Sequence, residues 1–139
     1  MMIMIPAVYQ GGKGKRVAAD FIPPADAMAQ MMKYNEELAK TGHLIALDGL
    51  HPIEKGARVS FGKGKPAVTD GPFIESKELF GGYWMTQFAS KEEAIEWVKK
   101  CPAAEGDTIE IRQVFEISDW PEDTAKAADN EAVQAAIKQ

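Results

Sequence analysis

One stretch of the chain, residues 68–97, constrains the fold more than any other. It opens with Asp70-Gly71-Pro72, which favours a turn because Asp can bond its own backbone, Gly accepts a positive φ and Pro fixes φ. Residues 80–88 then run FGGYWMTQF, an aromatic-rich segment that predicts a strand. The Gly81-Gly82 pair at its start indicates a bulge or a close approach of two backbones. The stretch therefore predicts a turn followed by a strand.

A helix is predicted immediately after this strand, over residues 91–100. Ser90 and Glu93 form a capping box, in which each side chain accepts a hydrogen bond from a backbone N–H at the start of the helix. Pro102 ends the helix, because proline cannot continue it. The apolar stripe of this helix consists of Ala94, Ile95, Val98 and Cys101.

The N-terminal part of the chain predicts a strand, a helix and a second strand. Residues 2–9 are apolar without alternation, which is typical of a strand covered on both faces. Pro23-Pro24 opens a helix that runs to about residue 40, and Gly42 is expected to end it in the left-handed conformation. Residues 43–47 are a second apolar run of strand length. The helical residues expected to share one face are Met28, Met31, Met32, Asn35, Leu38 and Ala39.

The remaining segments predict a hairpin, a last strand and a helical tail. Residues 57–61 and 67–69 flank a glycine- and lysine-rich turn at 62–65 and predict the hairpin. Residues 108–117 alternate apolar and polar side chains, as one half-buried strand would. Residues 118–139 are rich in alanine and charge, which predicts a helix that docks on a partner or frays.

In this order the elements predict an α+β fold: a ferredoxin-like split β-α-β antiparallel sheet with an inserted hairpin and two helices on one face. Yet the three segments 2–5, 44–47 and 83–85 present apolar side chains to both sides of the sheet. An uncovered face would leave a large apolar patch in water. We therefore predict a homodimer packed sheet to sheet, and the chain's own tail helix is the competing cover.

Composition excludes several classes of protein. The formal net charge of -5 disfavours direct nucleic-acid binding and anionic membrane surfaces, because both require an excess of Lys and Arg. Cys101 is the only cysteine, so neither an internal disulfide nor a cysteine metal cluster can form. The apolar start of the chain is too short for an export signal, and no membrane span is expected. We expect a cytoplasmic protein.

Five runs carry a resemblance to a known family: YNEELAKTG, GLHPIEKGARV, VTDGPFIESKELFGGYWM, SKEEAIEWVKKCP and IEIRQVFE. In their order and spacing they resemble the DGPF branch of the YCII-related family. The resemblance covers residues 1–119 as one ferredoxin-like domain and leaves 120–139 outside it as a C-terminal helical tail. It implies a dimeric α+β barrel and little about activity.

The resemblance also bears on chemistry. Some members of the wider family have been suggested to be enzymes because a His on the first helix stands near an Asp. The predicted helix at 24–40 contains no His, so that pair is not carried over. Some DGPF relatives occur beside or fused to sigma-factor-like proteins, which implies a regulatory setting.

Two residues are candidates for proton transfer. Asp70 lies at a turn that can hold a carboxylate rigidly at the edge of a cleft, although the same residue also serves simply to cap the turn. His51, in the loop GLHP, titrates near neutral pH and is a candidate general acid or base, although exposed loop histidines are usually inert. His43 directly follows a helix C-terminus, where it is expected to stabilise the helix.

A candidate ligand cleft is predicted between the sheet and the first helix. Met32 would line it, Lys77 would pair with an anion, and Tyr83 or Trp84 would form an aromatic wall. Packing and surface ion pairs are the simpler explanations of these residues. No cofactor and no metal site is predicted, since the two histidines do not have metal-ligand spacing. Cys101 is expected to be a buried, inert thiol.

Two hypotheses follow for the function. The first is a non-catalytic dimeric interaction or regulatory module in which the DGPF segment is a structural turn. The alternative is an enzyme or small-molecule-binding protein that uses the cleft near Asp70 and His51. The expected partners are a second copy of the chain and, under the alternative, a small-molecule ligand.

Overall fold

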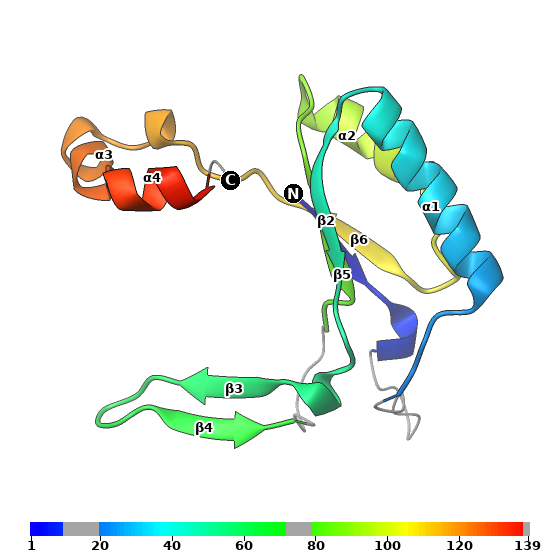
Figure 1. Ribbon diagram of the computed structural model, residues 1–139, viewed down its shortest axis with the longest axis horizontal. Coiled ribbons are helices and arrows are strands. Elements are labelled where there is room, and N and C mark those ends of the chain that lie inside the picture. Colours follow the sequence, from blue (N-terminus) through cyan, green and yellow to red (C-terminus); the bar gives the residue numbers. More distant parts are fainter. Residues whose placement is uncertain (10–19, 72–78, 138–139) are drawn as a thin grey trace.

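The computed structural model describes residues 1–9, 20–71 and 79–137 and has an α+β architecture (Figure 1). Its main sheet is antiparallel throughout, with the strand order β2-β5-β1-β6. β1 and β2 are connected by a helix and have β5 between them, and β5 and β6 are connected by another helix and have β1 between them. This is the predicted split β-α-β pattern. The four strands are β1 (Met2–Ile5), β2 (Leu44–Gly49), β5 (Gly82–Thr86) and β6 (Thr108–Ile111).

Two helices cover one face of this sheet: α1 (Ala25–Lys40) and α2 (Lys91–Val98) (Figure 1). The predicted stop of α1 is confirmed. Gly42 has a φ of 78°, the Gly42 N–H donates to the Ala39 carbonyl at 3.0 Å, and the His43 N–H donates to the Leu38 carbonyl at 3.1 Å. These bonds satisfy carbonyls that the end of a helix otherwise leaves without partners.

The capping box of α2 is also confirmed. The Ser90 hydroxyl accepts a hydrogen bond from the Glu93 N–H at 3.1 Å. The Glu93 carboxylate reaches back and accepts the Ala89 N–H at 2.8 Å. The start of α2 is therefore fixed by local sequence, as the spacing of the two side chains predicts.

The core lies between the sheet and the two helices. Leu38 and Met2 are 0% and 1% exposed, and Tyr34 packs edge-on against Trp84 with ring centroids 6.3 Å apart. The one polar residue in the described core, Asn35, accepts the Trp84 Nε1–H at 2.7 Å. This bond satisfies a donor that burial would otherwise leave unpaired.

The predicted close approach at the glycine pair is present. A Cβ on Gly82 would lie 2.6 Å from the Asp48 carbonyl oxygen, and a Cβ on Gly81 would lie 2.3 Å from Pro6 Cγ. Both distances are far below van der Waals contact. The glycines therefore let β5 pass close to β2 and to the end of β1.

Strand ends differ from the sequence prediction. β1 ends at Ile5 and gives way to a short 3-10 helix, η1 (Ala7–Tyr9), because Pro6 has no N–H for the ladder. β6 ends at Ile111, well before residue 117, opposite Met2 of β1, and just beyond it Met1 and Arg112 exchange two hydrogen bonds of 2.8 Å. β5 is likewise shorter than the predicted 80–88.

The tail contains two short helices in place of the predicted single one. They are α3 (Glu122–Ala128) and α4 (Glu131–Ile137), preceded by η3 (Ile117–Asp119). The break falls at Asp129-Asn130, where the Asn130 side chain accepts the Val133 N–H at 3.1 Å and caps α4. None of the helices in the described ranges is long and apolar enough to cross a bilayer.

The inserted hairpin is a separate two-stranded sheet, β3 (Ala57–Ser60) and β4 (Ala67–Asp70), that follows a 3-10 turn, η2 (Ile53–Lys55). Figure 1 shows the hairpin and the tail extending from opposite ends of the main sheet, both toward the side that α1 and α2 leave uncovered. The tail does not lie across this face of the sheet in its own chain. The molecule therefore consists of a packed two-layer body and two extended arms.

The centre of the face that α1 and α2 leave uncovered exposes less apolar surface than the sequence predicts. Its central side chains, Ile3 and Ile5, are only 4% and 6% exposed. They are flanked in the sheet register by polar neighbours, with Tyr83 and Glu110 on either side of Ile3. Most of the large exposed apolar side chains of the described chain lie elsewhere, on the arms and near the ends of strands.

Candidate functional site

Asp70 and His51 lie near the base of the hairpin. Asp70 is the last residue of β4 and pairs with Ala57, and His51 precedes the buried Pro52 that begins η2. Both residues are exposed. Within the described ranges, neither side chain makes a hydrogen bond or an ion pair. The structure thus brings the two candidates to the same region without joining them in a polar network.

The neighbouring Gly71 has a clear structural role. Its N–H donates to the Gly56 carbonyl at 2.9 Å, which closes the base of the hairpin. A Cβ at this position would lie 1.9 Å from the Ile53 carbonyl oxygen, so no side chain fits. The rest of the DGPF segment and the candidate Lys77 lie outside the described residues.

Tyr83 and Trp84 point to opposite faces of the sheet, because side chains alternate along a strand. Trp84 is 6% exposed and packs in the core against Tyr34. Tyr83 faces the uncovered side, where its hydroxyl donates to the Asp48 carboxylate at 2.7 Å. The hydrogen bond to Asp48, with the negative charge of that carboxylate, raises the pKa of Tyr83 above its ordinary value.

The proposed cleft between the sheet and α1 is filled by core side chains, including Leu38 and Trp84. Met31 packs against this core, whereas Met32 is 47% exposed at the surface of α1. Met32 therefore belongs to the outer surface and not to the layer between helix and sheet.

Asp48 was not among the sequence candidates because an Asp-Gly pair after an apolar run is typical of a loop. In the structure both residues still belong to β2, opposite Tyr83 and Gly82. Period-two alternation extended by one residue beyond Leu47 would have placed Asp48 on the uncovered face. The Asp48 and Tyr83 pair is the polar feature of that face that the sequence analysis missed.

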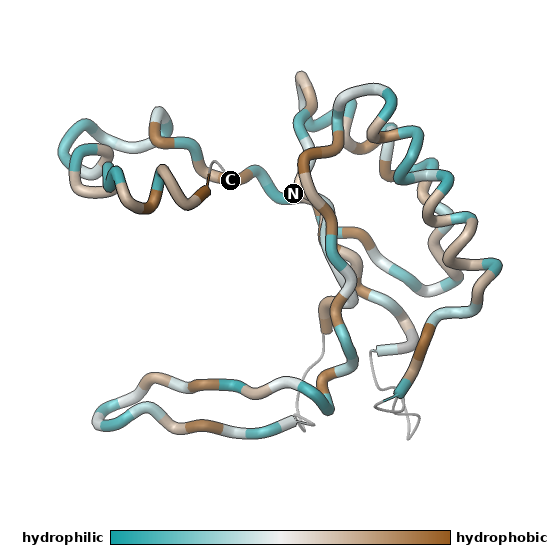
Figure 2. The backbone as a smooth tube through the Cα atoms, viewed as in Figure 1, coloured by the Kyte–Doolittle hydropathy of each residue, from teal (hydrophilic) through white to brown (hydrophobic). Residues whose placement is uncertain are grey.

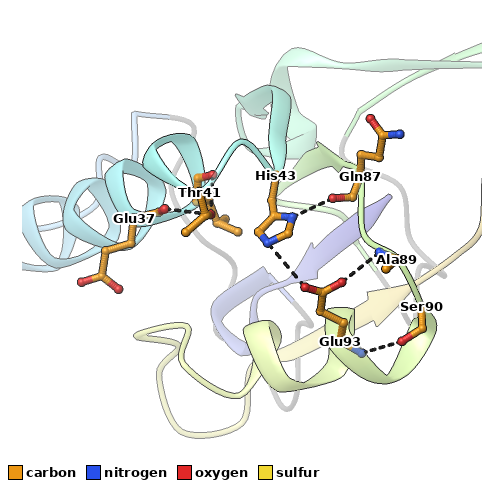
Figure 3. Close-up of polar contacts among 8 residues, drawn as sticks. Glu37, Thr41, His43, Gln87, Ala89, Ser90 and Glu93 are labelled. Atoms are coloured by element: carbon orange, nitrogen blue, oxygen red, sulfur yellow. Dashed lines mark hydrogen bonds and ion pairs between the residues drawn. The ribbon is translucent and has the colours of Figure 1, made fainter.

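A second polar cluster joins the end of α1 to the start of α2 (Figure 3). The His43 ring lies between the Gln87 carbonyl, 2.9 Å from Nδ1, and the Glu93 carboxylate, 3.6 Å from Nε2. Its faces contact Phe88 and Trp97, with ring centroids at 4.5 and 5.5 Å. Because Glu93 also caps α2, these contacts hold helix and strand ends together, and they favour the stabilising role expected for His43.

A third polar feature lies at the start of the hairpin. The Oε2 atom of Glu54, on η2, is buried and has no hydrogen-bond partner among the residues that the structure describes. Burial, and secondarily the negative charge of Glu54, raises the pKa of Tyr9. The Tyr9 hydroxyl itself donates to the Leu50 carbonyl at 3.4 Å. No signal in the sequence distinguished Glu54 from the other acidic residues.

Cys101 is half-buried at the end of α2, and burial, together with the negative charge of Asp107, raises its pKa to about 11. The thiol is therefore almost entirely protonated at neutral pH, as expected for an inert core cysteine.

This pKa leads to a test of thiol reactivity. At pH 8 the native protein is expected to react with Ellman's reagent roughly 100-fold more slowly than the denatured chain, since a pKa about two units higher lowers the thiolate fraction by that factor. Stability linked to this thiol is full below about pH 9 and declines as the pH rises toward 11, because only the unfolded state loses its proton there. A native rate equal to that of the denatured chain would show that Cys101 is accessible and activated.

More than half of the large exposed apolar side chains in the described residues lie on the arms and the linker to the tail, and hydrophobic residues occur along both arms in Figure 2. On the hairpin, Val59 and Val68 form a cross-strand pair and are 51% and 68% exposed, and Phe61 follows at 84%. Alternation places these residues on one face of the hairpin, with Arg58 and Thr69 on the other. The exposed apolar residues of the tail and its linker are Val114, Phe115, Ile117, Val133 and Ile137.

A known protein family matches most of this chain. A family model described as a YCII-related domain matches residues 13–118, which is more than half of the chain. No curated protein matches the chain. The matched region contains β2, β5 and β6 of the main sheet, both packed helices and the hairpin, whereas β1 precedes it and α3 and α4 follow it. In the part of the chain that the structure describes, no group of three metal-ligating side chains comes together.

Proposed function

We propose that this chain, which belongs to the YCII-related family, is a non-catalytic interaction module that acts as a homodimer, with the uncovered faces of two sheets packed together as a dimeric α+β barrel. The surface available for such packing is the face of the four-stranded sheet that α1 and α2 leave uncovered (Figure 1). The strands of this sheet have ferredoxin-like order. An interaction role is favoured because the two proton-transfer candidates, Asp70 and His51, are exposed and, among the described residues, make no hydrogen bond or ion pair.

The accessible surface of the single chain carries this proposal. It is 10674 Å², whereas a compact monomer of 15.2 kDa exposes about 7,100 Å². The excess of about 3,500 Å² is several times the area of roughly 800 Å² that each partner buries in a standard protein interface. A second copy of the chain would account for this excess. In a two-fold dimer the same exposed surface of each copy is covered by the other copy.

The arms support the same conclusion. An isolated two-stranded hairpin is marginally stable in water, and so is an isolated helix shorter than about 12 residues. The hairpin nevertheless exposes its entire apolar face, and α3 and α4 have seven residues each. Both arms therefore need a surface to pack on, and the packed body of the same chain does not supply it.

Two finer assignments accompany the proposal. We place the chain in the DGPF branch on its sequence, in which Gly71 closes the base of the hairpin and leaves no room for a side chain. We also infer a cytoplasmic location, since the sole cysteine is a protonated core thiol with no disulfide partner.

Sedimentation equilibrium tests the homodimer. At micromolar concentration the wild-type chain is expected to sediment at twice its monomer mass. Ala46 lies opposite Met85 on the uncovered face, so Ala46→Arg would insert a charge into the interface and is expected to weaken dimerisation at least about 100-fold.

Ala29→Arg is the matched control, because Ala29 is an exposed residue of α1 on the helical side of the molecule. It is expected to leave the dimer intact. A folded wild-type monomer at these concentrations would contradict the proposal, and so would equal association of the two arginine variants.

A further inference from the structure

The two arms carry charges of opposite sign. Residues 55–70, which span the hairpin, contain four basic residues and one acidic residue, and residues 116–137 of the tail contain six acidic residues and one basic residue. The basic residues of the hairpin are Lys55, Arg58, Lys63 and Lys65, and its acidic residue is Asp70. The acidic residues of the tail are Glu116, Asp119, Glu122, Asp123, Asp129 and Glu131, and its basic residue is Lys126.

Each arm also has apolar side chains that its own chain leaves in water. Val59, Phe61 and Val68 on the hairpin are at least half exposed, and so are Phe115, Val133 and Ile137 of the tail region. A basic arm with one apolar face and an acidic arm with exposed apolar residues are complementary in both respects.

Within one chain the two arms are far apart, since they leave opposite ends of the sheet (Figure 1). Both extend toward the uncovered side, where the second copy is proposed to pack. A two-fold axis between two facing sheets, parallel to the viewing direction of Figure 1, would place the hairpin of each copy beside the tail of the other. In such an isologous pair the contact is made twice.

We propose that the apolar face of the β3–β4 hairpin docks on the tail helices of a second copy, so that the arms of two chains clasp each other. This contact rests on the proposed homodimer and adds to it the segment of the partner that each arm holds. The tail helices α3 and α4 lie beyond the matched residues 13–118, whereas the hairpin lies within them.

Site-directed cross-linking tests the clasp. A chain with Val68→Cys is co-expressed with a tagged chain with Val133→Cys, and the purified mixture is treated with a short bismaleimide. The native Cys101 reacts slowly because its pKa is about 11, and the wild-type chain serves as the blank. The expected product is a cross-link between the two differently sized chains.

Thr69→Cys replaces Val68→Cys in the matched control, since Thr69 is the next residue and faces the other side of the hairpin. This control is expected to yield at least about five-fold less product. A product formed mainly between two Val68→Cys chains would overturn the clasp. A cross-link formed within one chain that carries both cysteines, with none between chains, would overturn it as well.

Charge reversal gives an independent readout. Lys63→Glu with Lys65→Glu is expected to raise the dimer dissociation constant about ten-fold at low salt, and Asp123→Lys with Glu131→Lys is expected to do the same. Mixing the two variants should restore tight association, because the reversed hairpin then meets the reversed tail. Failure of this rescue in a protein that sediments as a dimer would refute the clasp while leaving the sheet-to-sheet dimer standing.

Discussion

The variant Gly71→Ala is expected to open the base of the hairpin and to abolish dimerisation. An alanine Cβ would overlap the Ile53 carbonyl oxygen at 1.9 Å and approach the Gly56 carbonyl oxygen at 3.1 Å, and both are backbone atoms that cannot rotate away. The hydrogen bond from the Gly71 N–H to Gly56 is lost when the chain shifts to relieve this overlap. We expect the free energy of unfolding to fall by about 3 kcal/mol in urea titrations at fixed protein concentration.

Asp70→Asn is the matched comparison for this prediction. The Asp70 side chain is exposed, and no hydrogen bond or ion pair involves it within the described ranges. The variant is therefore expected to keep the stability and the sedimentation of the wild-type chain.

The pair of variants separates a structural turn from a catalytic one. If Asp70→Asn abolished a ligand-induced rise in melting temperature in a metabolite screen, while the fold remained intact, the alternative of a small-molecule-binding protein would replace the interaction module. If Gly71→Ala folded and dimerised normally, the structural interpretation of the turn would be wrong.

Leu38→Ala is expected to cost about 2–5 kcal/mol of stability. Leu38 is fully buried where α1 meets the sheet, and it contributes to the cluster of Met2, Tyr34 and Trp84. Its removal leaves a cavity that the rigid aromatic neighbours cannot fill. Urea unfolding followed by tryptophan fluorescence measures the loss.

Met32→Ala on the same helix is the control for this prediction. Met32 is 47% exposed, so its truncation is expected to change stability by less than about 0.5 kcal/mol. Equal losses for the two variants would mean that the described core is not the one that stabilises the protein.

Local signals correctly predicted the stop of α1, the start of α2 and the close backbone approach at the glycine pair. Ser90 with Glu93, Gly42, and the glycine pair at 81–82 each act through atoms within a few residues or through the space that a missing side chain leaves. These are short-range effects, so they can be recognised from the sequence without knowledge of the fold.

The ends of strands could not be predicted in this way, because they depend on the partner strand. β6 ends at Ile111, where its ladder with β1 reaches Met2, and only the topology reveals this pairing. The polar contacts between distant residues could not be predicted from local sequence either. Asp48 meets Tyr83, and Glu93 meets His43, across 35 and 50 positions of sequence, and no local pattern announces either contact.

The glycine at position 82 has a consequence for the uncovered face. Because β2 runs so close to β5 there, the main chain around Asp48 has little freedom to shift. The carboxylate and the Tyr83 phenol are thus pre-organised by the backbone and not by the packing of side chains. A partner that binds this face contacts a hydrogen-bonded pair that is already ordered. Binding there therefore costs little side-chain conformational entropy.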